Sequence, residues 1–278
     1  MEDLPELPGI RHEYIDAGGL RTHVALGGAQ DAPPLLLVHG WPQNWWAWRH
    51  VIPQLTERFR VIAADLRGHG WSEAPPGGYD KEQLASDVLA LLDALGLQRV
   101  SYVGHDWGGW TGFLAALRSP ERFARMLAVA IPHPWADPNP AQIGAVLGYQ
   151  VPISLPLVGV RAADPMVRRI LQVGRGGDRL SAAEVELFAG HIPPHVTVSM
   201  YRTYLTREIL PIVRGRYAHA QLQVPTTVFT GAMDLITRGS TSGPVTGQPQ
   251  LSVEVLDGVA HWIPEQRPQA IVDWLSRP

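Results

Sequence analysis

The stretch Gly104-His105-Asp106-Trp107-Gly108 decides the fold of this 278-residue chain. It follows an apolar run, Val100–Val103, that is typical of a buried strand, and it precedes Gly109–Arg118, which has a helical pattern. Small residues on both sides of the aspartate allow the sharp turn at which a strand passes directly into a helix. The stretch therefore predicts that Asp106 is presented at the carboxyl end of a buried parallel strand.

Strand and helix patterns alternate on either side of this turn. Strands are predicted at Arg11–Ala17, Leu20–Leu26, Pro34–Val38, Val61–Ala64, Val100–Val103, Met126–Ile131, Val224–Thr230 and Leu251–Leu256. Helices are predicted at Trp46–Arg58, Lys81–Leu95, Gly109–Arg118 and Pro264–Leu275. The first two strands are joined at Gly18-Gly19, which predicts a hairpin. The alternation predicts an α/β fold, a mostly parallel sheet flanked by helices on both faces.

The alternation stops after the strand that ends at Ile131. From about Pro132 to Leu222 the chain has prolines, glycines and amphipathic stretches, with no convincing strand. We therefore expect a core domain made of residues 1–132 and 223–278, with residues 133–222 inserted as a helical cap. The segment Gly239–Gln250 is rich in Gly, Ser, Thr and Pro and is predicted to be a loop.

The composition excludes several classes of function. The net charge of −3 and the lack of a basic stripe argue against a nucleic-acid partner. There is no signal-peptide pattern and no apolar run of roughly 18 residues, so a cytoplasmic protein without a membrane span is expected. The chain has no cysteine and no histidine pair with a persuasive metal-ligand spacing, so neither a thiol nucleophile nor a metal is expected. No glycine-rich dinucleotide motif or other cofactor signature is present.

The central residue of the turn determines the chemistry. Serine at this place must lose a proton before it attacks, whereas a carboxylate with an ordinary pKa of about 3.9 is already ionised. Asp106 is therefore predicted to attack a saturated carbon and to form an ester with the protein. Hydrolysis of that ester needs a base that activates water.

His261 is the predicted base and Asp234 the acid that orients it. Each follows one of the last two predicted strands, and the chain order nucleophile, acid, histidine is the one expected of this type of sheet. The oxyanion that forms during ester hydrolysis needs two N–H donors. We predict the backbone N–H groups of Trp107 and Trp41.

The motifs together carry a resemblance to a known family. HGWP at His39–Pro42, DLRGHGWS at Asp65–Ser72, GHDWGG from Gly104, GAMD at Gly231–Asp234 and a late histidine resemble the α/β-hydrolase-fold epoxide hydrolases and dehalogenases, the epoxide hydrolases in particular. The resemblance covers essentially the whole chain. It implies a helical cap inserted after the sixth strand, in which two tyrosines donate hydrogen bonds to the epoxide oxygen.

Tyr201 and Tyr149 match those two tyrosines by their short sequence contexts, and Tyr204 lies one helical turn from Tyr201. A proton donor at this place lowers the barrier to ring opening because an alkoxide is a poor leaving group. An apolar pocket is expected from the tryptophans Trp41, Trp45, Trp46, Trp107 and Trp110.

Three functions remain open from the sequence. The first is an epoxide hydrolase, a hydrolase of ether bonds whose partners are a small apolar epoxide and water, and with which a homodimer is compatible. The second is a haloalkane dehalogenase that uses the same nucleophile, with the Trp107 indole as a halide donor; dehalogenases usually place asparagine or another donor where Trp41 stands. The third is a non-catalytic ligand-binding protein of the same fold. The string Asp65–Ser72, together with His39 and His105, is expected to hold backbone geometry.

Overall fold

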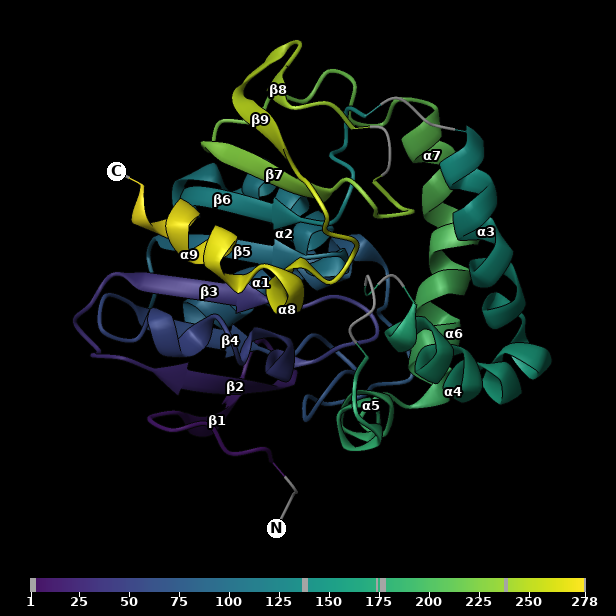
Figure 1. Cartoon of the computed structure of the whole chain (residues 1–278), viewed down its shortest axis with the longest axis horizontal. Helices are drawn as coiled ribbons and strands as arrows, with labels where there is room; N and C mark the ends of the chain where they lie inside the picture. Colours follow the sequence, from purple (N-terminus) through teal and green to yellow (C-terminus); the bar gives the residue numbers. More distant parts are fainter. Residues whose placement is uncertain (1–3, 137–139, 174, 176–178, 238–239, 278) are drawn as a thin grey trace.

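The computed structural model describes residues 4–136, 140–173, 175, 179–237 and 240–277. Within them the strands form a sheet in the order β1-β2-β4-β3-β5-β6-β7-β9-β8 (Figure 1). The strands are β1 Arg11–Asp16, β2 Arg21–Gly27, β3 Pro34–Val38, β4 Arg60–Ala64, β5 Val100–His105, β6 Phe123–Val129, β7 Thr226–Gly231, β8 Gly243–Val245 and β9 Gln248–Leu256. The pairs from β4 to β9 are parallel, whereas β1, β2 and β8 pair antiparallel at the two edges. The predicted hairpin and mostly parallel sheet are confirmed.

Helices cover both faces of this sheet. The helices are α1 Lys81–Ala94, α2 Trp107–Arg118, α3 Pro140–Ser154, α4 Pro156–Gln172, α5 Ala182–Ala189, α6 Pro194–Thr203, α7 Ile209–Val213, α8 Ile263–Gln266 and α9 Pro268–Ser276. Successive strand residues point to opposite faces. Leu36 of β3 packs in the core that includes α1 and α2, while its neighbours Leu35 and Leu37 pack in the core that includes α8 and α9. Figure 1 shows these two helix pairs on opposite sides of the sheet.

The residues between β6 and β7 form helices α3 to α7, and we refer to them as the inserted segment. Figure 1 shows this segment gathered beside the sheet rather than on either of its faces. Helix α4 buries Gly159, Ala163, Val167 and Leu171, residues spaced by four along one helical face. Residues 137–139, 174 and 176–178, which fall in the predicted cap, lie outside the described residues. In the part of the chain that the structure describes, no helix is both long and apolar enough to cross a bilayer.

Three local predictions were wrong. Trp46–Arg58 forms two short 3-10 turns, Trp45–Trp48 and Ile52–Gln54, instead of a helix, and Pro53 has no N–H with which to continue one. The predicted C-terminal helix is divided at Arg267, whose backbone (φ −143°, ψ 55°) is not helical. The α-helical conformation is disfavoured there because Pro268 follows. The third wrong prediction is the loop Gly239–Gln250, which contains β8 and the start of β9. Strands β8 and β9 form a hairpin, and the Gly-rich composition reflects its turn, where Gly247 has φ +78°. Gly239 itself lies outside the described residues.

Candidate active site

Asp106 occupies a strained turn between β5 and α2. Its backbone has φ 51° and ψ −122°, a conformation that residues with a side chain rarely adopt. The turn is tight enough that a Cβ on Gly104 would lie 2.4 Å from the Gly108 carbonyl oxygen, and a Cβ on Gly108 would lie 2.3 Å from that of Val38. Glycine is therefore required at both places. The strained turn holds the Asp106 carboxylate at the end of β5.

The carboxylate of Asp106 is buried, and one of its oxygens is already held by a backbone donor. Trp41 donates its N–H to Oδ1 of Asp106 at 2.9 Å. Burial raises the pKa of Asp106 to about 6, although the charge of His261 and hydrogen bonds from the backbone N–H groups of Trp107 and Trp41 oppose this rise. The two predicted oxyanion donors thus both act on the side chain of Asp106.

His261 stands between the two carboxylates. Its Nε2 is 3.8 Å from Oδ2 of Asp106, and its Nδ1 is 3.2 Å from Oδ2 of Asp234. Asp234 also accepts hydrogen bonds from the backbone N–H of Ile236 and the hydroxyl of Thr237, each at 2.9 Å. Burial works against charge on Asp234, but His261 and these donors lower the pKa of Asp234 below its ordinary value. Burial likewise opposes protonation of His261, yet the two carboxylates raise its pKa above the ordinary value.

Two further histidines hold the backbone of the loops at this site. His39 donates from Nδ1 to the Gly40 carbonyl and accepts the N–H of Leu66 at Nε2, both at 3.0 Å. His105 donates from Nε2 to the carbonyl oxygen of His261 at 2.9 Å. Burial lowers the pKa of His39, and burial together with the nearby His261 lowers that of His105 to about 3. Both are therefore neutral, and their expected structural role is confirmed.

The string Asp65–Ser72 is also structural, as expected. Oδ1 of Asp65 accepts the N–H of Trp45 at 2.7 Å, and Oδ2 accepts the N–H of Trp71 at 3.1 Å. His23 lies 2.7 Å from the same Oδ2. Asp65 is thus fully engaged in holding turns together on the core.

A cavity of about 120 Å³ brings the predicted site residues together. Asp106, Asp234, His261, Trp41, Tyr149 and Tyr201 line it, and its apolar lining includes Ile170, Val173, Met233, Leu235, Ile236 and Trp262. The ring of Tyr149 packs edge-to-face against that of Tyr201 and parallel to that of Trp41. The side-chain amide of Gln150 donates to the Tyr149 hydroxyl at 3.3 Å. Burial raises the pKa of both tyrosines, so both are protonated and able to donate a hydrogen bond.

The other predicted tryptophans lie elsewhere. Among the described residues, the cavity lining includes Trp41 but neither Trp107 nor Trp110. Trp110 is one turn further along α2, and its ring contacts Tyr217. The ring of Trp107 contacts those of Tyr201 and Tyr204, behind the cavity wall. Trp45 is fully buried on the opposite face of the sheet and contacts Trp46.

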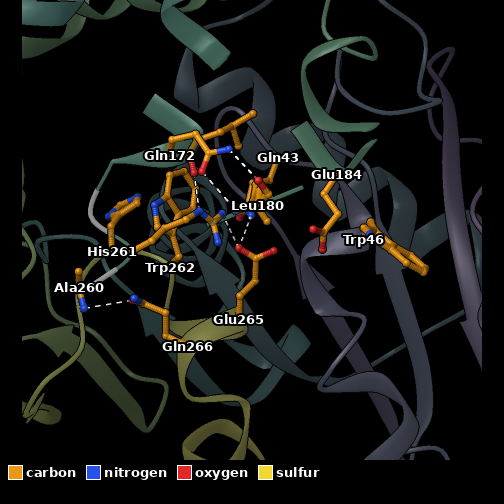
Figure 2. Close-up of polar contacts among 12 residues, drawn as sticks. Gln43, Trp46, Gln172, Leu180, Glu184, Ala260, His261, Trp262, Glu265 and Gln266 are labelled. Carbon is orange, nitrogen blue, oxygen red and sulfur yellow. Dashed lines mark hydrogen bonds and ion pairs between the residues drawn. The ribbon is translucent and has the colours of Figure 1, made fainter. Parts of the chain in front are cut away.

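A buried ion network joins the loop of His261 to the inserted segment (Figure 2). Glu265 accepts hydrogen bonds from Arg49 at 2.5 Å and from Arg175 of the inserted segment at 2.7 Å. Arg49 also pairs with Glu184 of the inserted segment at 2.8 Å, and Gln43 donates to Glu265 at 3.3 Å. The side chains of Arg49, Arg175 and Glu265 are 9%, 4% and 5% exposed. This network connects the parts of the chain that supply Trp41, His261 and the tyrosines.

Residues that support the site were missed from the sequence. Glu265, Arg175 and Thr197, which accepts the Trp41 indole N–H at 3.0 Å, are distant in sequence from the residues they contact. The spacing of Glu265 four residues after His261 is a weak signal for one of them. No spacing pattern points to the other two, because their partners are fixed only by the position of the inserted segment.

Comparison with known proteins agrees with this geometry. Residues 33–150 match the family model described as alpha/beta hydrolase fold. A soluble epoxide hydrolase of Corynebacterium sp. (strain C12) is 40% identical over 52% of this chain, a match that spans 48% of that protein and therefore less than half of it. Epoxide hydrolase A of Mycobacterium tuberculosis is 27% identical over 91% of this chain and 92% of that protein.

Solved structures extend the likeness to almost the whole chain. The structure of epoxide hydrolase CorEH without ligand has a TM-score of 0.81 and 26% identity, covering 96% of this chain and 97% of that one. Epoxide hydrolase VrEH1 from Vigna radiata has a TM-score of 0.80 and 25% identity, covering 98% of each chain. The sheet order, the strained turn at Asp106 and these comparisons show an α/β-hydrolase fold, and the relatives and solved structures named above, to which the chain is similar, are epoxide hydrolases.

Proposed function

We propose that this protein is an epoxide hydrolase that converts a small apolar epoxide to a vicinal diol through an ester on Asp106. The observation that carries the proposal is the cavity in which a buried aspartate lies with a histidine and two protonated tyrosines. In this proposal residues 133–222 act as the cap and supply both tyrosines, while residues 1–132 and 223–278 supply the nucleophile, base and acid.

Ring opening uses the two oxygens of Asp106 differently. Oδ1 is held by the Trp41 N–H, so Oδ2 is the oxygen free to attack a ring carbon. The new O–C bond forms as the C–O bond of the epoxide breaks, and Tyr149 or Tyr201 gives its hydroxyl proton to the departing oxygen. The products of this step are the hydroxyalkyl ester and a tyrosinate.

Ester hydrolysis uses the arrangement already present around Asp106. His261 takes a proton from water through Nε2, and the hydroxide adds to the Asp106 side-chain carbon. The charge then develops on Oδ1, which the N–H groups of Trp41 and Trp107 stabilise. Cleavage of the ester bond releases the diol and the aspartate, and the proton on His261 returns to the tyrosinate. Asp234 stabilises the protonated histidine meanwhile.

Loss of the Asp106 charge prepares His261 for this second step. In the free protein that charge is one of the causes that raise the pKa of His261. The ester is neutral, so this contribution disappears once the ester forms, and His261 becomes a neutral base more readily.

Product analysis with two probes tests the proposed function. With styrene oxide we expect phenylethanediol from the wild type, and none above background from Asp106→Ala. Tyr149→Phe and Tyr201→Phe should each lower kcat by about a hundredfold, the size expected for loss of a general acid. With 1-bromobutane, release of bromide without any diol from styrene oxide would instead assign the protein as a dehalogenase. Binding of both probes without any product would indicate a ligand-binding protein.

A further inference from the structure

Lys81, the first residue of α1, buries its side chain beside the active site. The side chain is 1% exposed, and its Nζ lies 4.1 Å from the centre of the Trp107 ring. The same nitrogen is 3.6 Å from Oε2 of Glu208. A buried ammonium over an indole face makes a strong cation–π contact because little water competes for the charge. Lys81 therefore fixes the ring of the residue that follows the nucleophile.

Glu208 holds this lysine from the inserted segment. Its Oε1 accepts the backbone N–H of Lys81 at 2.8 Å, so the carboxylate binds both the main chain and the side chain of one residue. Glu208 ends a π-helical turn, Tyr204–Glu208, and such turns occur often at functional sites. A buried ion pair is frequently no more stabilising than two apolar side chains of similar size. The pair is therefore better explained by what it holds in place than by stability.

Trp107 links the lysine to the tyrosine pair. Its ring packs edge-to-face against Tyr201, with centres 6.3 Å apart, and against Tyr204, with centres 5.0 Å apart. Its buried indole N–H has no acceptor at ordinary hydrogen-bond distance in the described part of the chain. Burial, followed by the nearby Tyr149 and Asp106, raises the pKa of Tyr201, whereas the Trp107 side chain, a neighbouring donor, lowers it. The indole N–H is thus a hydrogen-bond donor near the Tyr201 oxygen, which becomes negative during ring opening.

We propose that Lys81 is a positioning residue for ring opening, which holds Trp107 so that its indole N–H stabilises the negative charge on Tyr201. The inference rests on the proposed function. In the step concerned, the Tyr201 proton passes to the epoxide oxygen as the ring C–O bond breaks and the Asp106 O–C bond forms. Lys81 and Trp107 exchange no atoms. Ester hydrolysis develops its charge on Asp106 instead. The Lys81 charge also attracts that carboxylate, so we expect loss of Lys81 to slow the second step less than the first.

The test separates these two steps. Lys81→Met is combined with Glu208→Gln, because methionine alone would leave the Glu208 carboxylate buried without its cation. Lys81→Arg keeps the charge and serves as the matched rescue. Ester formation from styrene oxide is timed by intact protein mass in the His261→Gln background, where the ester persists. Its decay is timed by rapid quench with the wild-type histidine present.

We expect the double variant to form the ester about tenfold more slowly, the size of a desolvated cation–π contact, and to lose clearly less in the rate of ester hydrolysis. Lys81→Arg should recover most of the first rate. Equal loss in both steps, or no loss in either, would overturn the role of Lys81. Absence of any ester and any diol from the protein with Lys81 intact would instead refute the proposed function itself.

Discussion

Asp106 has two properties that suit the nucleophilic role proposed for it. Its backbone strain presents the side chain to the cavity, and the Trp41 N–H fixes which oxygen remains free to attack. Burial makes the carboxylate more nucleophilic by removing water, and the same burial raises its pKa to about 6. The gain in reactivity therefore limits the pH range over which the aspartate is ionised.

The pH dependence of ester formation follows from that pKa. A group whose pKa is raised in the folded protein is protonated below that pKa, and a protonated carboxyl group does not attack an epoxide. We expect kcat/KM for styrene oxide to fall on the acid side with an apparent pKa of about 6. Because His261 lowers the pKa of Asp106, the acid limb of ester formation should move to higher pH in His261→Gln. Rates that stay constant down to about pH 5 would contradict this account.

That the three proposed catalytic residues lie together could be predicted from the sequence because each lies next to a strand end. Asp106, Asp234 and His261 follow β5, β7 and β9, and the carboxyl ends of parallel strands meet at one edge of a sheet. Trp110 could not be placed in the same way. Its position one turn into α2 directs it to Tyr217, and the direction of a helical side chain depends on how the helix packs.

The helix α8 connects the loop of His261, the proposed base, to the inserted segment. Glu265 lies within it and binds Arg49 from the core and Arg175 from the inserted segment. Arg175 also lies over the ring of Trp262, whose indole N–H donates to the Val173 carbonyl at 2.7 Å. The loop that carries His261 is therefore bound to the inserted segment beside the cavity.

Removal of the Glu265 charge should destabilise the protein. Glu265→Gln leaves Arg175 buried without a carboxylate partner, and we expect a loss of about 3 kcal/mol in the free energy of unfolding. The matched control is Glu186→Gln, whose pair with Arg168 is 63% and 37% exposed and should cost less than about 1 kcal/mol. Urea unfolding followed by tryptophan fluorescence compares the two. Equal losses of unfolding free energy in both variants would show that the buried network stabilises the protein no more than the exposed pair does.

Helices and strands of the core could be predicted because their apolar residues repeat with a clear period. Lys81–Leu95 and Val100–Val103 match α1 and β5 closely. The ion networks could not be predicted, because no sequence spacing relates Lys81 or Glu265 to the residue with which it pairs. The π-helical turn at Tyr204–Glu208 also leaves no periodic signal, since one turn departs from an otherwise helical stretch.

In the proposed mechanism, the core and the inserted segment supply different groups to the site. The sheet and its loops present the proposed nucleophile, base and oxyanion donors, while the inserted segment presents both tyrosines. The cavity exists only where these parts meet, with Trp41 stacked on Tyr149 across the boundary. Its volume of about 120 Å³ and its lining could not be predicted from the sequence, because they depend on how the inserted segment lies on the core.

The most direct measurement is the intact mass of His261→Gln after incubation with styrene oxide. Ester formation needs Asp106, whereas its hydrolysis needs His261, so the ester should accumulate. We predict an increase equal to the whole mass of the epoxide, located by peptide mapping on Asp106 and absent from His261→Gln combined with Asp106→Ala. A folded His261→Gln variant that gains no mass while the wild type produces diol would contradict the account, because water would then attack the epoxide without an ester on the protein.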